Sequence, residues 1–489
     1  DLHSFPTRRS SDLVLSNVRR VFANMSWMMI SQILTSVLAF FWTILTTRYL
    51  GVVDNGIFGN AVSFANLLVV IADLGMTTYI TRAISTDSNL EKSYIGNALT
   101  IKLLLSFVYL AVTLIIVNLF GWNNRIGFVI FLFAFESVIK SFCNLFYASF
   151  QAHEKIKYQA ISNIILNVLT FVFIVIVTFT SFGLFGIAVA YIIANILALI
   201  YSYLAIRRYF IVPKLLFDKD LSKKLIIAGI PFALTSLFYT VYYSIDMVML
   251  TKFIGAYPTG LYNASYKLIN VLTLFYTIYS AVVFPVMSKL FKNDRDMLTL
   301  SFNKSVKYLS LVTIPLAIAT LFYAGDVIRI CYGNAFAEAD NVLKILIWTV
   351  CFLFINGAAS LVLNASHKEF SVTKIYSIAA VFNVILNFIL IPNYSVYGAS
   401  IATVLSEVLI LILELYMLSK INQLPDRHLI FDLVKIIMAS IIMGFVLNIL
   451  GLSVWLAIPI GIIVYLVVII AIRTTDEDDK TILRQLLNR

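Results

Sequence analysis

The stretch Arg48-Tyr49-Leu50-Gly51-Val52-Val53-Asp54-Asn55-Gly56-Ile57-Phe58 is a short polar turn between two long apolar segments. It returns 204 positions later as Lys252-Phe253-Ile254-Gly255-Ala256-Tyr257-Pro258-Thr259-Gly260-Leu261-Tyr262. A cation, two glycines and an aromatic residue recur in one register without a gap. This recurrence predicts that the chain contains two related halves.

Two further similarities support the internal repeat. Residues 151–155 correspond to 364–368 at an offset of 213, and residues 184–190 correspond to 396–402 at an offset of 212. The order is kept and the offset drifts only slightly, as one loop insertion would produce. We therefore expect two homologous halves of about two hundred residues, the parallel kind of repeat found in transporters.

The composition excludes a soluble protein. Hydrophobic residues make up 61% of the 489 residues and charged residues only 12%. A soluble fold could not cover that much apolar surface with polar groups. The three cysteines and four histidines are scattered singly, so we predict no metal site.

The apolar segments predict an all-α membrane protein. A span needs about 20 predominantly apolar residues, and fourteen segments meet this condition. They are 26–47, 56–81, 94–120, 127–150, 158–182, 184–206, 225–253, 261–290, 309–324, 342–363, 372–391, 396–419, 429–450 and 453–472.

The distribution of cations predicts the orientation. With the N-terminus in the cytoplasm, 25 Lys and Arg residues fall on cytoplasmic segments and only four on the opposite side. This skew follows the positive-inside rule. It places the protein in the cytoplasmic membrane with both termini inside. It also explains the net charge of +11 without nucleic-acid binding.

The predicted organisation has five parts. Residues 1–13 resemble a translated sequencing adaptor more than a signal peptide and are expected to be non-native. The first lobe is 14–206, a basic cytoplasmic linker follows at 207–224, and the second lobe is 225–420. Residues 421–489 add two spans and a cytoplasmic tail.

Several motifs then carry a family resemblance over residues 17–420. They include Arg48-Tyr49-Leu50-Gly51, Ala72-Asp73-Leu74-Gly75-Met76, Gly229-Ile230-Pro231 and Thr313-Ile314-Pro315-Leu316-Ala317. With this order and spacing the chain resembles the polysaccharide-biosynthesis flippases. These are Wzx-like members of the multidrug/oligosaccharidyl-lipid/polysaccharide exporter superfamily.

The resemblance implies a fold and a function. It implies two six-helix lobes around a central cavity that opens alternately to each side. The implied substrate is a polyprenyl-diphosphate-linked oligosaccharide, with membrane lipids, a polysaccharide polymerase and glycosyltransferases as candidate partners. No cofactor is implied, and coupling to H⁺ or Na⁺ is open.

Cations inside spans are the candidate substrate-binding residues, because an uncompensated diphosphate is expensive at bilayer depth. We select Lys102, Lys140, Lys267 and Arg48. For Lys140 the alternative is a structural pair with Glu136 one helical turn earlier. For Lys102 and Lys267 the alternative is that the side chain extends towards the membrane–water interface. For Arg48, which is expected to end a helix, it is a favourable position at a helix C-terminus.

Acids inside spans are the candidate ion-coupling residues, and prolines are the candidate hinges. Asp246 is preferred for coupling, with Asp73 and Glu407 as further candidates. A structural salt bridge of Asp246, or a helix break at Asp73, is the alternative. Pro231 and Pro315 interrupt predicted helices and mark bends, whether moving or static.

Two other functions compete with a flippase. A drug or cation antiporter of the same superfamily predicts an acidic cavity. A polyprenyl-dependent glycosyltransferase or polymerase needs a sizeable outer loop or an acidic motif, and the predicted outer loops are short. We therefore expect a transporter and not an enzyme.

Overall fold

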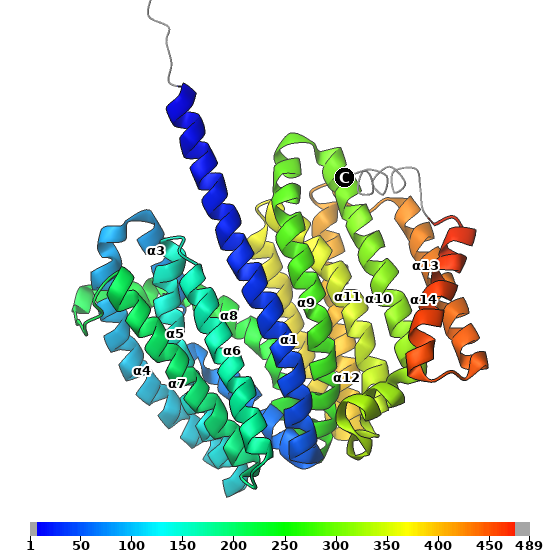
Figure 1. Cartoon of the computed structure of the whole chain (residues 1–489), viewed down its shortest axis with the longest axis horizontal. Helices are drawn as coiled ribbons and strands as arrows, with labels where there is room; N and C mark the ends of the chain where they lie inside the picture. Colours follow the sequence, from blue (N-terminus) through cyan, green and yellow to red (C-terminus); the bar gives the residue numbers. More distant parts are fainter. Residues whose placement is uncertain (1–6, 475–489) are drawn as a thin grey trace, which may run out of the picture. The chain divides into compact units, whose positions relative to one another are not determined.

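The computed structural model describes residues 7–474, with side chains from residue 26 onward. Within that range the secondary structure is helical and contains no strand. The helices are α1 (Thr7–Leu68), α2 (Val70–Asp73), α3 (Met76–Thr86), α4 (Glu91–Leu119), α5 (Asn124–Ala152), α6 (Lys157–Thr178), α7 (Gly183–Tyr209), α8 (Lys219–Phe253), α9 (Ala256–Asn293), α10 (Arg295–Tyr332), α11 (Ala339–Ala365), α12 (Glu369–Ser419), α13 (Arg427–Leu450) and α14 (Val454–Ala471) (Figure 1). The expected non-native segment 1–13 lies partly outside the described residues, and most of the expected C-terminal tail lies outside them.

Twelve helices of the described part are long and apolar enough to cross a membrane. Two of them, Ser26–Asp73 and Glu369–Ser419, contain 48 and 51 residues, enough for two crossings each. Each is interrupted once by a residue with positive φ, Gly51 (φ 67°) and Ser395 (φ 52°). The structure confirms an all-α membrane protein, and these two interruptions account for the fourteen predicted spans.

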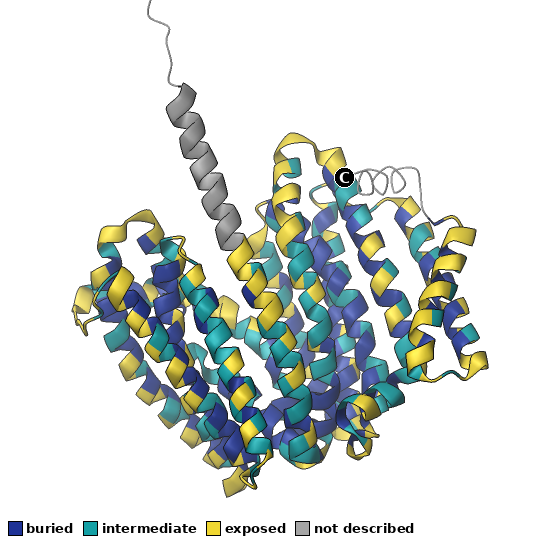
Figure 2. Ribbon diagram, in the orientation of Figure 1, coloured by how far each residue is buried: buried dark blue, intermediate teal, exposed yellow. Residues whose placement is uncertain are grey.

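The outer faces of the helices are apolar, as contact with lipid requires. Large apolar side chains are exposed along α14, for example Trp455 at 69% and Ile470 at 68%, whereas Ser440 in α13 is fully buried. Figure 2 shows exposed residues along the outer faces of α13 and α14. Apolar groups that face outward and polar groups that face other helices are the arrangement expected of helices in a bilayer.

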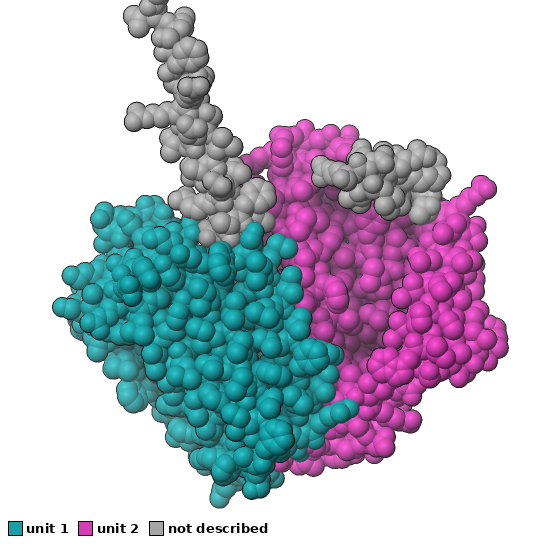
Figure 3. Space-filling model, viewed as in Figure 1, with its two compact units in different colours: residues 1–50, 57–248 teal, residues 51–56, 249–489 magenta. Residues whose placement is uncertain are grey.

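The chain forms two compact units (Figure 3). Unit 1 contains the residues up to Leu50 together with Ile57–Val248. Unit 2 contains Gly51–Gly56 and the residues from Met249 onward. The boundary therefore falls inside α8, and the turn that opens the sequence repeat belongs to unit 2.

Within unit 2 the two copies of the repeated turn contact each other reciprocally. A Cβ atom on Gly56 would overlap the carbonyl oxygen of Ala256, and a Cβ atom on Gly260 would overlap that of Val52. Val52 and Ala256 are themselves equivalent at the offset of 204, as are the two glycines. The Asn55 amide fixes the crossing by donating to the Gly260 carbonyl at 2.9 Å. Glycine recurs in the sequence because the backbones meet here.

Within unit 1 the helix is broken at Leu74 and Gly75. Both residues have positive φ, 46° and 70°, and they separate α2 from α3. A Cβ atom on Gly75 would overlap backbone atoms of Gly229 and Ala233 in α8. The predicted span 56–81 is therefore divided, because the chain turns where it packs against α8.

The candidate hinges lie elsewhere than these breaks. Pro231 and Pro315 lie inside α8 and α10, and the helices continue through both positions. Their role in motion stays a prediction.

Candidate functional site

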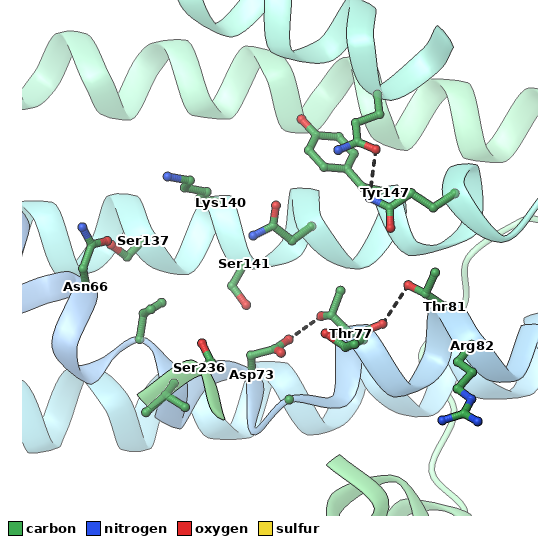
Figure 4. Close-up of a pocket in the computed structure, with 17 residues that line it drawn as sticks. Asn66, Asp73, Thr77, Thr81, Arg82, Ser137, Lys140, Ser141, Tyr147 and Ser236 are labelled. Atoms are coloured by element: carbon green, nitrogen blue, oxygen red, sulfur yellow. Dashed lines mark hydrogen bonds between the residues drawn. The ribbon is translucent and has the colours of Figure 1, made fainter. Parts of the chain in front are cut away.

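A polar cavity of about 650 Å³ lies inside unit 1 (Figure 4). Its walls come from α1, α2, α3, α5, α6 and α8. Most of its lining side chains carry hydroxyl or amide groups, and three are charged: Asp73, Arg82 and Lys140. Binding sites for small molecules have volumes of this order.

One face of α5 forms a wall of this cavity. The polar residues on it are Ser137, Lys140, Ser141, Asn144 and Gln151. Their spacing follows the helical period of 3.6 residues, so they lie in one stripe. Apolar residues occupy the other faces of α5 and are largely buried. The facing wall includes Thr77 and Thr81 of α3, as Figure 4 shows.

The helix break delivers Asp73 to the cavity. Asp73 is the last residue of α2, and the turn at Leu74 and Gly75 follows it. Its carboxylate accepts a hydrogen bond from the Thr77 hydroxyl in the first turn of α3. The predicted helix break and the predicted functional acid therefore coincide at this residue.

Asp73 forms an ion pair with Lys102 of α4. The Lys102 amine also donates to the carbonyl (3.1 Å) and hydroxyl (2.7 Å) oxygens of Ser141. The Lys102 side chain is 1% exposed, whereas that of Asp73 is 27% exposed. Lys102 is thus the buried counter-charge of Asp73. It does not line the cavity, and it does not extend towards the interface.

Lys140 is exposed and lines the cavity at the middle of the α5 stripe. The alternative for Lys140, a direct ion pair with Glu136, is not formed. Glu136 accepts instead from the amide of Asn195 in α7 at 2.8 Å, and Lys140 has no ion pair among the described residues. Arg82 is the second lining cation. Two cations against one carboxylate give the lining a net charge of +1, and Lys102 behind the wall adds another positive charge.

An amide bridge joins two walls of the cavity. Gln151 of α5 donates from Nε2 to Oε1 of Gln159 in α6 at 3.0 Å. Nearby, the Tyr147 hydroxyl donates to the Ser162 hydroxyl at 2.8 Å, which fixes the ring. This region offers hydrogen-bond donors and acceptors without charge.

The other predicted site residues lie outside this cavity. Arg48 is exposed three residues before Gly51, and Asp246 is buried in α8. In unit 2, the Lys267 amine donates to the Asn55 side-chain oxygen at 3.2 Å. Glu407 of α12 is buried, and its carboxylate accepts from Asn356 of α11 at 2.8 Å. Of the predicted residues, the structure brings together Asp73, Lys102 and Lys140.

Sequence reasoning missed the uncharged lining residues. Ser141, Asn144, Gln151 and Thr77 were not selected, because the search was for charges inside spans. The signal that could have found them is the period of Ser, Asn and Gln along 137–151. Within the part of the chain that the structure describes, no group of His, Cys, Asp and Glu could hold a metal ion.

Comparison with known proteins gives the family. The family model described as "Polysaccharide biosynthesis protein" matches residues 21–291, and the MatE model matches 231–389. The capsular polysaccharide biosynthesis protein CapF of Staphylococcus aureus is 23% identical over 414 residues, 81% of this chain and 99% of CapF. The probable low-salt glycan biosynthesis flippase Agl15 of Haloferax volcanii is 24% identical over 204 residues, 41% of this chain and 43% of Agl15.

Among solved structures, the lipid II flippase MurJ in an inward closed conformation has the same fold. The TM-score is 0.76 at 19% identity, over 94% of this chain and 99% of MurJ. The polysaccharide biosynthesis model covers more than half of the sequence, and the fold is that of the multidrug/oligosaccharidyl-lipid/polysaccharide exporter superfamily. The chain therefore belongs to the polysaccharide biosynthesis protein family of the multidrug/oligosaccharidyl-lipid/polysaccharide exporter superfamily.

Proposed function

We propose that this protein is a flippase for polyprenyl-diphosphate-linked oligosaccharides. It moves the polar head group across the cytoplasmic membrane by alternating access, with both termini in the cytoplasm. The names of its relatives, a capsular polysaccharide biosynthesis protein and glycan and lipid II flippases, support this class. Transport of this kind forms no covalent product, so the protein is proposed as a transporter and not an enzyme.

The positively charged polar cavity of unit 1 carries the proposal. A diphosphate requires compensating cations at bilayer depth, and Lys140 and Arg82 line this space. Sugar hydroxyls require hydrogen-bond partners, which the amides of Asn144, Gln151 and Gln159 supply. The head group therefore has both kinds of partner in one cavity, while the polyprenyl chain remains in lipid.

Ion coupling is part of the proposal. Asp73 lies in the cavity wall and balances a buried lysine. A diphosphate in the cavity would add negative charge next to the Asp73 carboxylate, and H⁺ or Na⁺ bound at that carboxylate would offset it. Asp246 and Glu407 remain coupling candidates at other positions.

A drug or cation antiporter is the second candidate, and the MatE match over 231–389 favours it. Such a transporter is expected to bind cations and therefore to use an acidic cavity. The lining of the unit 1 cavity carries the opposite sign, which supports the flippase.

The test is reconstitution into liposomes that contain a defined lipid-linked oligosaccharide. Transport is measured as protection of the glycan from a probe outside the vesicle. Lys140→Ala and Arg82→Ala are expected to reduce transport at least tenfold, since each removes roughly 1.4 kcal/mol or more of anion binding. Lys92→Ala removes an exposed lysine of α4 that lies outside the cavity, and it is the matched control. Wild-type transport by both cavity variants would refute the site, and absence of any transport by the wild-type protein would refute the function.

A further inference from the structure

The connection between α7 and α8, residues 211–218, has no regular secondary structure and is fixed on the surface of unit 1. The backbone of Leu216 donates to the Gly96 carbonyl at 3.2 Å and accepts from the Thr100 hydroxyl at 2.7 Å. The Asp218 amide donates to Asn97 Oδ1 at 2.6 Å. Three hydrogen bonds therefore hold this segment along α4.

The α7 end of this connection, at Phe210, is held by aromatic packing. The ring of Phe210 lies 5.3 Å from that of Phe150 and 5.7 Å from that of Tyr158, measured between centroids. The ring of His153 also lies 5.3 Å away, and the Lys155 amine lies 5.1 Å from the centre of the Phe210 ring. Both ends of the connection are thus attached to unit 1, so its side chains have defined directions.

The attached segment presents apolar side chains outward. Leu216 points towards α4 and is 37% exposed, whereas Leu215 and Phe217 are 65% and 67% exposed. Val212 is 49% exposed. Large apolar side chains held in the open mark a contact surface.

The position along α4 places this surface near the edge of the bilayer. The 29 residues of α4 extend about 44 Å, longer than the hydrocarbon core of about 30 Å. The segment crosses α4 at Gly96–Thr100, about 8–14 Å from the start of the helix by its rise per residue. With the hydrocarbon core centred on α4, its boundary with the head groups lies about 7 Å from the helix start, so the segment lies at that boundary and just inside it.

The charge of the surrounding region indicates which kind of lipid head group would bind there. Residues 207–224 contain six cations and two carboxylates, which gives a net charge of +4. All six cations are exposed, namely Arg207, Arg208, Lys214, Lys219, Lys223 and Lys224. Clusters of Lys and Arg beside a span attract anionic lipids, and apolar side chains next to them enter the interface.

We propose that residues 207–224 form a lipid-binding surface for anionic phospholipids. Leu215 and Phe217 enter the interface, and the surrounding cations bind the phosphate head groups. The surface would keep the connection between α7 and α8 on the membrane, independently of which substrate the protein moves.

The first experiment tests insertion. A spin label is attached at Phe217→Cys or at Ser88→Cys in the full-length protein with Cys331→Ser, reconstituted in phosphatidylcholine with phosphatidylglycerol. Ser88 is exposed at the polar turn before α4 and serves as the control. The label at 217 is expected to be accessible to oxygen and shielded from a water-soluble nickel chelate, unlike the label at 88. Equal accessibility to the chelate at both positions would overturn the proposal.

The second experiment tests the charge. A dye at position 217 reports the local concentration of acceptor-labelled phosphatidylglycerol or phosphatidylcholine by energy transfer. Phosphatidylglycerol is expected to be enriched by about fivefold or more, the effect of one or more cations at an anionic surface. The variant Arg207→Gln/Arg208→Gln/Lys214→Gln is expected to lose this enrichment, whereas Lys374→Gln in unit 2 retains it. No enrichment in the parent protein, or full enrichment in the triple variant, would overturn the assignment to anionic lipid.

Discussion

Replacing Lys102 or Asp73 separately is expected to destabilise the protein by different amounts. Lys102→Met leaves the Asp73 carboxylate without its cation, but this carboxylate is 27% exposed to the cavity and keeps its bond from Thr77. Asp73→Asn leaves the Lys102 ammonium, which is 1% exposed, among neutral groups. The more deeply buried charge suffers more from the loss of its partner, so Asp73→Asn is expected to be the more damaging change.

The magnitudes follow from what is known of buried ion pairs. Removal of one partner costs about 3–5 kcal/mol of unfolding free energy when the other is fully buried. We therefore expect about 3–5 kcal/mol for Asp73→Asn and about 2–4 kcal/mol for Lys102→Met, because water reaches Asp73. The double variant has no unpaired charge and is expected to lose only about 0–2 kcal/mol. The resulting coupling energy is at least about 3 kcal/mol.

The assay is equilibrium unfolding in mixed micelles of dodecyl maltoside and SDS, with all four proteins measured at one pH. A double variant more stable than either single variant would confirm that the pair is coupled. Additive effects, within about 0.5 kcal/mol, would refute the energetic coupling of Asp73 and Lys102. A larger loss for Lys102→Met than for Asp73→Asn would refute the argument from exposure.

Three further predictions test other parts of the structure. Gly260→Ala places a Cβ against the facing turn and is expected to lower the unfolding free energy by about 1–3 kcal/mol; Gly325→Ala, where the nearest atom is 3.9 Å away, is expected to be neutral or stabilising in the same unfolding assay. Asn195→Ala removes the amide that bonds Glu136 and is expected to cost about 1–3 kcal/mol, and an unchanged unfolding midpoint would contradict it. Asn97→Ala releases one backbone amide of the α7–α8 connection and is expected to speed its proteolysis while other cleavage sites stay protected.

The fold was predictable because membrane spans depend on local composition. Long apolar segments separated by polar turns give the crossings directly. The glycines of the predicted repeat also meet in a backbone contact, Gly56 against Gly260, which the sequence did not predict. The break at Ser395 falls between the predicted spans 372–391 and 396–419, whereas a helix break at Asp73 was only one of two alternatives for that residue. Leu74 adopts positive φ at the turn that packs against α8, which the residue type does not reveal, while the prolines in α8 and α10 leave those helices continuous.

The candidate site was only partly predictable. Lys140 was found because a lysine in the middle of an apolar segment is unusual. The pairing of Lys102 with Asp73 could not be read from the sequence, because it depends on α2 and α4 lying side by side. The nearest acid to Lys140 in the sequence, Glu136, is bonded by Asn195 from another helix. The partner of a charged residue is therefore decided by the tertiary fold, whereas the presence of the charge can be read from the sequence.

The reciprocal contact at Gly56 and Gly260 has a consequence for which mutations the two halves of the sequence tolerate. Residue 52 touches 260 and residue 256 touches 56, which is the geometry of a self-complementary interface between two identical subunits. In such a dimer one gene position supplies both glycines, so a single mutation alters the contact twice. After duplication into one chain the positions are inherited separately, and each can be lost alone. Swapping the two turns, 51–56 and 255–260, within the chain should therefore be better tolerated than placing any larger residue at either glycine.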